Sequence, residues 1–387
     1  MNNSLIIKRI KEVLKKKGSS FALHEPYFDT NEINELKKCI KSGYVSTIGN
    51  YVKKFENKIK SFTRSKYTVS TVNGTSAIHL ALKVLNINSS HEVILPTLSF
   101  IAAGNAITYC GATPHFVDCE KETLGIDVDK LEKYLNSSAI IKKKGFYFNK
   151  KTKKKIKAII AVHVFGNPMK IERLVRVAKK FNLRLIEDAA EALGSKVNGR
   201  HVGTFGDIGI LSFNGNKIIT SGGGGMMITN NRKLAYKGLH LSTTAKKPHK
   251  WEYFHNEIGF NYRLPNINAA LGYSQLKKLK KNIYLKRKLF QVYKKKLSGL
   301  KDILLLEEMK KNKSNYWLNT IILKKPNKKK RDKLLKDLYI NKIYSRPIWN
   351  LLHTLPMFRK CPKSNLNNSK DIFNSIINIP SSAFLAD

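Results

Sequence analysis

Lys217 has surroundings that suit a reactive amine. It stands in "SFNGNKIITSGGGGMMITN", residues 212–230, between two apolar runs of β type. Apolar neighbours lower the proton affinity of a lysine, and its neutral amine can then attack a carbonyl, which is how Schiff-base lysines arise. The glycines at 222–225 allow close backbone approach and positive φ angles before the strand-like "MMIT". Because the chain holds 72 lysine and arginine residues, a solvated surface cation is the competing interpretation.

Two other short segments could bind the charged parts of a ligand. In "NGTS", residues 73–76, Gly74 lets the backbone approach an anion, and the amides and hydroxyls of Thr75 and Ser76 can hold a phosphate at a helix start. Asp188, in "IEDAAEALGS", ends an apolar strand, where a carboxylate is costly unless it meets a cation or a protonated ring nitrogen. A simple helix cap is the alternative at both places.

Together these groups match the needs of one cofactor. Pyridoxal phosphate requires a phosphate anchor, an acidic partner for its pyridinium nitrogen and an amine for a Schiff base. Residues 73–76, Asp188 and Lys217 supply them, and Ser212 adds a hydroxyl near the end of a strand-like run. No single part is specific, so the interpretation depends on their order and spacing.

The segments that carry these groups predict an α/β fold. A β-rich segment at 66–74 leads into a helix over 75–85, which Thr75 or Ser76 is placed to cap. Further buried strands alternate with helical runs such as 171–181. These strands are predicted at 92–96, 113–118, 156–166 and 183–188. The alternation predicts a mostly parallel sheet covered on both faces, with ligands at the carboxyl ends of strands and at helix starts.

Shifts in composition predict the domain borders. Residues 1–22 form an N-terminal extension, and residues 23–264 form a large α/β domain. From about residue 265 the chain has long helices rich in Lys and Leu and a short strand at 316–323, which predicts a smaller α+β domain over 265–387. Residues 141–157 look like an exposed hairpin inserted ahead of a buried strand.

The formal charge of +45 could indicate an anionic partner. Basic stretches such as residues 142–157 can bind nucleic acid, anionic membranes or phosphorylated substrates. The cations are mainly lysines, however, and they occur on nearly every segment beside abundant Asn and Ile. A genome rich in A and T would produce this bias on the surface of any protein. We find no zinc-finger, ribonucleoprotein or helix-turn-helix pattern, and we therefore expect no nucleic-acid partner.

Hydropathy and cysteine spacing exclude other classes of protein. No window holds the roughly 18 consecutive apolar residues of a membrane span, and the first residues lack a signal-peptide core, so we expect a cytoplasmic protein. The four cysteines form no CxxC pair, which predicts reduced thiols and neither disulfides nor a metal site.

Several sequence blocks resemble the sugar aminotransferases of the DegT/DnrJ/EryC1/StrS family, which share the type I (aspartate aminotransferase) fold of pyridoxal phosphate enzymes. The matching blocks are "NGTSAIHLAL", "ILPTLSFIAAGNAI", "GATPHFVD", "VHVFGNP", "IEDAAEALGS", "GTFGDIGILSFNGNKIITSGGGG" and "GFNYRLPNINAALGYSQL". The legionaminic-acid branch is most similar, through "LHEPYF", "FNGNKIIT" with its four glycines, "TAKKPHKWEY", "SNYWLN" and "SRPIWNLLHTLPMF". Many members carry a glutamate where Gly223 stands here, and its absence is a mark of this branch.

The resemblance implies roles for individual residues. Lys217 would join pyridoxal phosphate as a Schiff base and then move a proton between cofactor and substrate carbons. Relatives that dehydrate sugars carry histidine there, so Lys217 favours transamination. Asp188 would keep the pyridine nitrogen protonated, and Glu191 would lie near the ring hydroxyl. The other cofactor contacts would be Gly74, Thr75 and Ser212 at the phosphate and Phe100 on the ring face, for which core packing is the alternative.

The resemblance also implies a homodimer. Asn261, in "GFNYRLPN", would reach the phosphate of the cofactor bound by the neighbouring subunit. Each active site would then be complete only in the dimer.

The implied substrates are L-glutamate and a nucleotide-linked 4-keto sugar. By analogy the acceptor is a 2-acetamido-4-keto-2,6-dideoxyhexose aminated at C4, in the biosynthesis of legionaminic acid or a related surface glycan. The alternatives are a GDP-linked perosamine-type sugar without the N-acetyl group, and a non-catalytic basic protein that binds nucleic acid or membranes on the same scaffold. The sequence leaves open UDP against GDP and the configuration of the new amine.

Three residues are candidate substrate contacts. Arg346, in "YSRPIW", and His353, in "LLHTL", could bind glutamate or the diphosphate, since a guanidinium suits carboxylate and phosphate groups. Surface or packing roles are the alternatives for both. His163, in "VHVFG", lies either near the cofactor or in the core as a buried histidine with satisfied hydrogen bonds.

Overall fold

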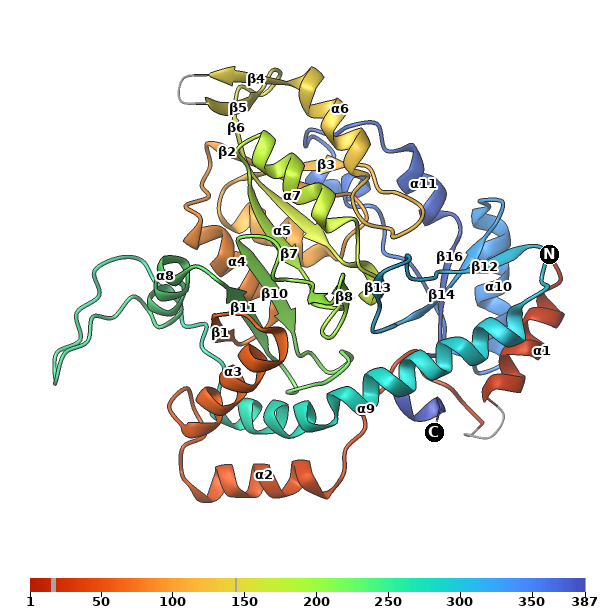
Figure 1. Ribbon diagram of the computed structural model, residues 1–387, viewed down its shortest axis with the longest axis horizontal. Coiled ribbons are helices and arrows are strands. Elements are labelled where there is room, and N and C mark those ends of the chain that lie inside the picture. Colours follow the sequence, from red (N-terminus) through yellow and green to blue (C-terminus); the bar gives the residue numbers. More distant parts are fainter. Residues whose placement is uncertain (15–18, 143–144, 387) are drawn as a thin grey trace.

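The computed structural model describes residues 1–14, 19–142 and 145–386. Within these residues a central sheet of nine strands follows the order β1–β11–β10–β7–β6–β2–β3, with the β4–β5 hairpin attached to β6 (Figure 1). The strands along this order are β1 (Tyr67–Thr71), β11 (Gly225–Thr229), β10 (Ile208–Ser212), β7 (Arg184–Asp188), β6 (Lys155–Val162), β2 (His91–Pro96) and β3 (Thr113–Val117). The five strands from β10 to β3 are parallel, whereas β11 runs antiparallel to β10 and β1. The predicted α/β class with a mostly parallel mixed sheet is therefore confirmed.

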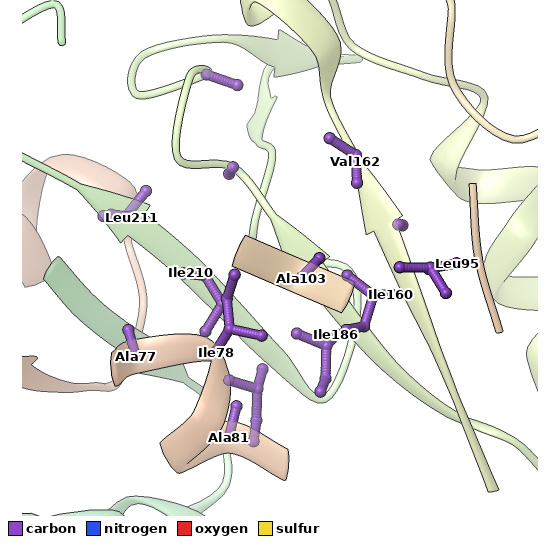
Figure 2. Packing of buried hydrophobic residues seen from close by; sticks show 14 of the residues in the cluster. Ala77, Ile78, Ala81, Leu95, Ala103, Ile160, Val162, Ile186, Ile210 and Leu211 are labelled. Carbon is purple, nitrogen blue, oxygen red and sulfur yellow. The ribbon is translucent and has the colours of Figure 1, made fainter. Parts of the chain in front are cut away.

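Two layers of helices cover the central sheet. Figure 1 shows α7 (Ile171–Lys180) in front of the sheet and α5 (Ile101–Tyr109) behind it. The remaining helices around this sheet are α4 (Gly74–Val84), α6 (Val128–Ser138) and α8 (Arg232–Ser242). In Figure 2 the small side chains of Ala77 and Ala81 let α4 pack closely on strand residues such as Ile186 and Ile210. Burial of this apolar face fixes the start of α4 at the edge of the sheet.

Some predicted boundaries were wrong by a few residues. The cap of α4 is Asn73 rather than Thr75 or Ser76, because its side chain accepts a hydrogen bond of 2.8 Å from the Ser76 amide. The strand predicted at 156–166 ends at Val162, since Phe165 and Gly166 adopt positive φ angles. The strand predicted at 316–323 begins only at Asn319. A positive φ of 45° at Tyr316 breaks the extended backbone before it.

The C-terminal part of the chain forms a second, smaller sheet beside a long helix. Helix α9 (Asn266–Leu297) leads to a sheet in the order β12 (Ile303–Leu305), β14 (Asn319–Leu323), β16 (Ile376–Ile379) and β15 (Arg346–Pro347). The helices α10 (Lys328–Ile340) and α11 (Asn367–Phe373) accompany it. Helix α1 (Asn3–Leu14), within the predicted N-terminal extension, buries Ile6 and Ile10 in the same apolar cluster as α9 and α10. The domain borders at 22 and 264 stay a prediction.

Helices α2 (Thr30–Lys41) and α3 (Asn50–Thr63) pack against α9. A third, small sheet joins the two parts of the chain, in the order β13 (Asn312–Lys313), β8 (Lys196–Val197) and β9 (Arg200–His201). Both arrangements tie residues beyond 265 to the central sheet. They explain how side chains far apart in sequence reach one site.

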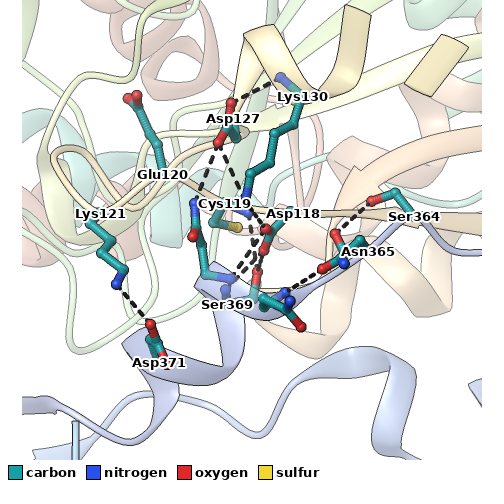
Figure 3. Close-up of polar contacts among 12 residues, drawn as sticks. Asp118, Cys119, Glu120, Lys121, Asp127, Lys130, Ser364, Asn365, Ser369 and Asp371 are labelled. Carbon is teal, nitrogen blue, oxygen red and sulfur yellow. Dashed lines mark hydrogen bonds and ion pairs between the residues drawn. The ribbon is translucent and has the colours of Figure 1, made fainter. Parts of the chain in front are cut away.

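A polar network also connects the C-terminal part to the central sheet (Figure 3). Asp118, just after β3, accepts hydrogen bonds from the Ser369 amide at 2.8 Å and the Ser369 hydroxyl at 2.6 Å. Lys130 on α6 donates to the other oxygen of Asp118 at 2.8 Å. Because Asp118 is buried, these bonds compensate the loss of its hydration and fix α11 against the sheet.

A hairpin lies ahead of β6, as expected, but it begins and ends earlier than the predicted segment 141–157. It is formed by strands β4 (Ala139–Lys142) and β5 (Phe146–Asn149), which pair antiparallel. Residues 143 and 144 of this segment lie outside the described residues. Among the helices that the structure describes, none is both long and apolar enough to cross a membrane. All four cysteines are free thiols.

Candidate active site

A cavity of about 320 Å³ lies at the carboxyl edge of the parallel strands. It is lined from the start of α4, the loop after β2, the ends of β6, β7 and β10, and two tryptophans from the C-terminal part of the chain. The polar lining residues are Asn73, Thr75, Ser99, Asp188, Glu191, Ser212, Asn214, Asn216 and Lys217. The site predicted from the strand ends is thus a single cavity.

The start of α4 forms one end of the cavity. A Cβ atom at Gly74 would lie 3.2 Å from the Cβ of Ser212, so a larger residue there would crowd the end of β10. Gly74, Thr75 and Ser212 all line the cavity, as predicted. Helix amides and hydroxyl groups converging at a helix start suit a phosphate group.

Asp188 lies on the cavity floor at the end of β7 and is 8% exposed. One of its oxygens accepts a hydrogen bond of 3.1 Å from the Ala190 amide. Burial raises the pKa of this carboxyl, and the nearby Lys217 ammonium opposes the shift. A buried carboxylate in this position favours a ligand that brings a proton or a positive charge to it.

Glu187, next to Asp188, is a structural carboxylate that the sequence analysis missed. It is fully buried and accepts hydrogen bonds from the amides of Gly203, Phe205 and Gly206 at 2.6–2.7 Å. Its carboxylate also lies 3.2 Å from Nε2 of His163. The spaced glycines at 194, 199, 203 and 206 are a sequence signal that could have indicated a loop closing onto this strand.

His163 is fully buried beneath the cavity. Its Nδ1 accepts from the Met169 amide at 3.3 Å, so Nε2 carries the proton that is donated to Glu187. The ring nitrogens are both satisfied, which matches the buried-histidine alternative. His163 is not one of the described residues that line the cavity.

Lys217 is held inside the cavity rather than solvated. Its side chain is 13% exposed, and Nζ lies 3.3 Å from Oε1 of Glu191. The same nitrogen lies 4.0 Å from the centre of the Trp317 ring. Burial raises the pKa of Glu191, and the charge of Lys217 opposes this shift. The predicted amine and both predicted carboxylates therefore share one site.

Trp317 is the second residue that the sequence analysis missed. Its Nε1 donates a hydrogen bond of 2.7 Å to the carbonyl of Asn216, the residue before Lys217. Its backbone amide donates to Oδ1 of Asn315 at 2.8 Å, and Nδ2 of Asn315 donates to the carbonyl of Glu191 at 2.9 Å. Asn315 thus connects the backbones of the two residues that contact the Lys217 amine.

Phe100 and Trp349 form the aromatic side of the cavity. Phe100 is 54% exposed, lines the cavity and lies edge-on to Trp349, with ring centres 6.3 Å apart. Such exposure argues against core packing as the role of Phe100. An uncovered ring at the cavity suits stacking on an aromatic ligand.

Asn261, Arg346 and His353 do not line this cavity within the part of the chain that the structure describes. Asn261 and Arg346 are exposed. His353 is half-buried, and its Nδ1 lies 2.7 Å from the hydroxyl of Thr97, in the loop after β2. Burial and the cations Lys363 and Lys370 lower the pKa of His353. The roles of Arg346 and His353 as substrate contacts, and of Asn261 at the phosphate of the neighbouring subunit's cofactor, stay predictions.

Gly166 must be glycine for Asn315 to hold its place. Its φ is +85°, and a Cβ atom there would overlap Oδ1 of Asn315 and lie 3.0 Å from the Glu191 carbonyl. We expect Gly166→Ala to lower the free energy of unfolding by about 2–4 kcal/mol, measured by urea denaturation. Gly199→Ala is the matched control, because φ is +79° and no heavy atom lies within 4 Å. It should cost only about 1 kcal/mol. Equal costs for both variants would contradict the close packing at Gly166.

Lys286, on α9, is a fully buried amine that supports Trp317 from behind. Its Nζ donates to the Trp317 carbonyl at 3.0 Å and to the Ser381 carbonyl. Burial lowers the pKa of this amine well below its usual 10.5, so the unfolded chain binds more protons than the folded one at pH values between the lowered pKa and 10.5. Its stability penalty is therefore largest at low pH and is relieved as the pH rises towards 10.5.

This shift predicts a pH-dependent difference between wild type and Lys286→Met. The free energy of unfolding of the wild type should rise relative to the variant as the pH approaches 10.5 from below, by at most ~1.4 kcal/mol per pH unit. Lys288→Met, an exposed neighbour on α9, should give a curve parallel to the wild type. Parallel curves for Lys286→Met as well would mean that Lys286 keeps its charge when buried.

The lining residues fit pyridoxal phosphate. The start of α4 and Ser212 suit its phosphate, the buried carboxylate of Asp188 suits a protonated ring nitrogen, and Lys217 offers the amine. The open face of Phe100 suits its aromatic ring.

Comparison with known proteins points to the same chemistry. The model of the DegT/DnrJ/EryC1/StrS aminotransferase family matches residues 26–387. The chain is 39% identical over 336 residues to GDP-perosamine synthase of Escherichia coli O157:H7, covering 87% of this chain and 86% of that protein. It is 38% identical over 366 residues to GDP-perosamine synthase of Vibrio cholerae, covering 94% and 95%. A solved DegT DnrJ EryC1 StrS aminotransferase from Brucella abortus has a TM-score of 0.84 at 25% identity, with 92% of each chain covered.

Proposed function

Since the chain belongs to the DegT/DnrJ/EryC1/StrS aminotransferase family, we propose that it transfers the amino group of L-glutamate to C4 of a nucleotide-linked 4-keto-6-deoxyhexose. It is a pyridoxal-phosphate-dependent sugar aminotransferase with the type I fold. This enzyme class displaces the alternative of a non-catalytic basic scaffold. The observation that carries the proposal is the buried Lys217 amine in one cavity with Asp188 and the start of α4.

Each residue of the cavity then has a chemical task. When bound, pyridoxal phosphate supplies an electron sink for the substrate carbon that loses a proton. Nζ of Lys217 would hold the cofactor covalently and, once released, would take the proton and return it at the neighbouring carbon. The carboxylate of Asp188 would keep the ring nitrogen protonated. Gly74, Thr75 and Ser212, which line the cavity, would hold the phosphate, and Phe100 would contact the ring.

For the acceptor, our first candidate is the 2-acetamido-4-keto-2,6-dideoxyhexose of the legionaminic-acid type. Its support is the set of branch-specific blocks, including "SNYWLN" and the four glycines after Lys217. A second candidate is a GDP-linked 4-keto-6-deoxymannose, supported by the identity of 38–39% to two GDP-perosamine synthases. Both sugars present the same ketone at C4 and differ at C2 and in the nucleotide.

A glutamate-dependent amination assay on both sugars, each with UDP and GDP, decides between them. With either nucleotide, we expect kcat/KM for the N-acetylated sugar to exceed that for the sugar without the N-acetyl group by roughly 10²-fold, since unpaired polar groups in a pocket are costly. The reverse preference would assign the second candidate. Amino transfer from ¹⁵N-glutamate to neither sugar, with bound cofactor present, would overturn the proposal.

The enzyme is a homodimer with shared active sites in this proposal. Residues 243–262 form an arm that reaches away from the body of the molecule next to α8 (Figure 1). The arm exposes large apolar side chains, among them Tyr253 at 79% and Ile258 at 85%. Asn261 is exposed at the root of the arm, bridged to Thr243. Such a cluster of exposed apolar groups favours a partner surface, and a second copy would place Asn261 at the partner's phosphate.

Mixing two inactive variants tests this arrangement. Lys217→Ala and Asn261→Asp each impair every site of their own homodimer. If sites are shared, random exchange of subunits restores one intact site in each mixed dimer, so about a quarter of the wild-type activity should return. No recovery from a mixture shown to contain mixed dimers would contradict a shared site. A protein that is monomeric at the concentration of the assay would also contradict a shared site.

A further inference from the structure

Two side chains from different parts of the chain hold the amine of Lys217. Glu191 follows β7, and its Oε1 lies 3.3 Å from Nζ. Trp317 belongs to the segment before β14, and the centre of its ring lies 4.0 Å from Nζ. A carboxylate and an indole face each favour an ammonium group, through a charge-assisted hydrogen bond and a cation–π contact.

Both side chains are fixed by contacts that do not involve Lys217. The second oxygen of Glu191 accepts from the Phe165 amide at 2.8 Å. The indole of Trp317 donates to the Asn216 carbonyl at 2.7 Å, and Lys286 binds the Trp317 carbonyl at 3.0 Å. Trp317 is 5% exposed and Glu191 is 8% exposed, so water competes little for either contact. The place for the amine is therefore built in advance.

Transamination needs such a place. The lysine is joined to the cofactor in one half of the cycle and is free in the other, when the amino group travels on the cofactor. A free lysine side chain has rotamer entropy to lose before it can return a proton to a fixed carbon. A built site that keeps the amine beside the cofactor removes most of that cost in advance.

We propose that Glu191 and Trp317 form a resting site for the Lys217 amine during the half of the cycle in which it is not joined to the cofactor. The inference rests on the proposed role of Lys217 and adds a positioning role for Trp317. Trp317 couples the C-terminal part of the chain to the catalytic amine. Its indole contacts Nζ of Lys217 and also donates a hydrogen bond to the carbonyl of Asn216, the residue before Lys217.

The test uses the cofactor-free protein. The rate at which the Lys217 amine is reductively methylated at neutral pH is measured by peptide mass analysis. We expect Trp317→Leu to raise this rate about 5- to 30-fold, because the loss of the cation–π contact frees the amine. Trp317→Phe, which keeps an aromatic face, should recover most of the protection. Trp349→Leu removes the other indole of the cavity, which contacts Phe100 and Phe165 rather than Lys217, and should leave the rate unchanged.

Equal rates in wild type and Trp317→Leu, or an equal rise in Trp349→Leu, would overturn the resting site. If Trp317→Leu fails to fold, Trp317→Phe and Glu191→Gln are compared instead. The methylation rate of Lys217 should then rise less in Trp317→Phe, which keeps an aromatic face, than in Glu191→Gln. A crystal structure with pyridoxamine 5′-phosphate should place Nζ of Lys217 against Glu191 and Trp317, and a different partner for Nζ would refute the inference. Absence of a covalent bond between Lys217 and pyridoxal phosphate would instead refute the proposed function, which distinguishes the two failures.

Discussion

Lys217→Ala lowers the rate of amino transfer by roughly 10²–10⁴-fold from the loss of proton transfer alone. The rate falls further if covalent binding of the cofactor by Lys217 also speeds the reaction, because no other amine in the cavity can replace it. Among the residues that line the cavity in the described chain, Lys217 is the one lysine. The measurement is the glutamate-dependent formation of the amino sugar, together with the visible absorption band of the lysine-bound cofactor, which borohydride abolishes in the wild type.

Lys233→Ala is the matched control for this variant. Lys233 is an exposed lysine on α8 and lies outside the cavity, so its removal should leave both the band and the rate unchanged. A borohydride-sensitive band in Lys217→Ala would show that another lysine binds the cofactor. The proposed mechanism would then fail.

Asp188→Asn lowers kcat by about 10²–10³-fold while the cofactor still binds. The substitution keeps the size of the side chain but removes the buried negative charge that we propose to hold a proton on the ring nitrogen. Preorganised charges in buried sites commonly contribute this much to a reaction rate. The proposed phosphate contacts at Gly74, Thr75 and Ser212 are unchanged in this variant, so the affinity for the cofactor should change far less than kcat.

Cofactor affinity and kcat are therefore measured together for Asp188→Asn. Asp129→Asn is the control, since Asp129 is an exposed carboxylate in the first turn of α6. A kcat within tenfold of the wild type in Asp188→Asn would mean that the ring nitrogen needs no carboxylate. A collapse of cofactor affinity with unchanged kcat would place Asp188 at another part of the cofactor.

The structure also bears on the strongly basic composition. Several lysines form ion pairs with the few acids, such as Lys278 with Glu32 at 2.6 Å and Lys170 with Glu120 at 2.5 Å. Few lysine or arginine side chains are buried. Lys286 is one of them, and its amine donates hydrogen bonds to backbone carbonyl groups. The net positive charge of the chain therefore lies mainly on its surface and not in the candidate active site.

The sequence by itself determined the residues that stand at the ends of regular elements. Asp188 and Ser212 close apolar strands, Gly74 begins a helix, and Lys217 follows a strand, so local patterns place all four at one edge of a parallel sheet. The helix cap at Asn73 and the late start of β14 at Asn319 were missed, since a single hydrogen bond or one positive φ angle decides such boundaries.

Only the tertiary structure decided which distant side chains complete the site. Trp317 is 100 positions from Lys217 in the chain, and it reaches the amine because residues beyond 265 fold back onto the central sheet. His163 was a candidate contact by residue type, yet just after the end of β6 its ring turns towards Glu187, and it does not line the cavity. Local periodicity reports which face of an element is buried, whereas the packing of one element against another decides what that face touches.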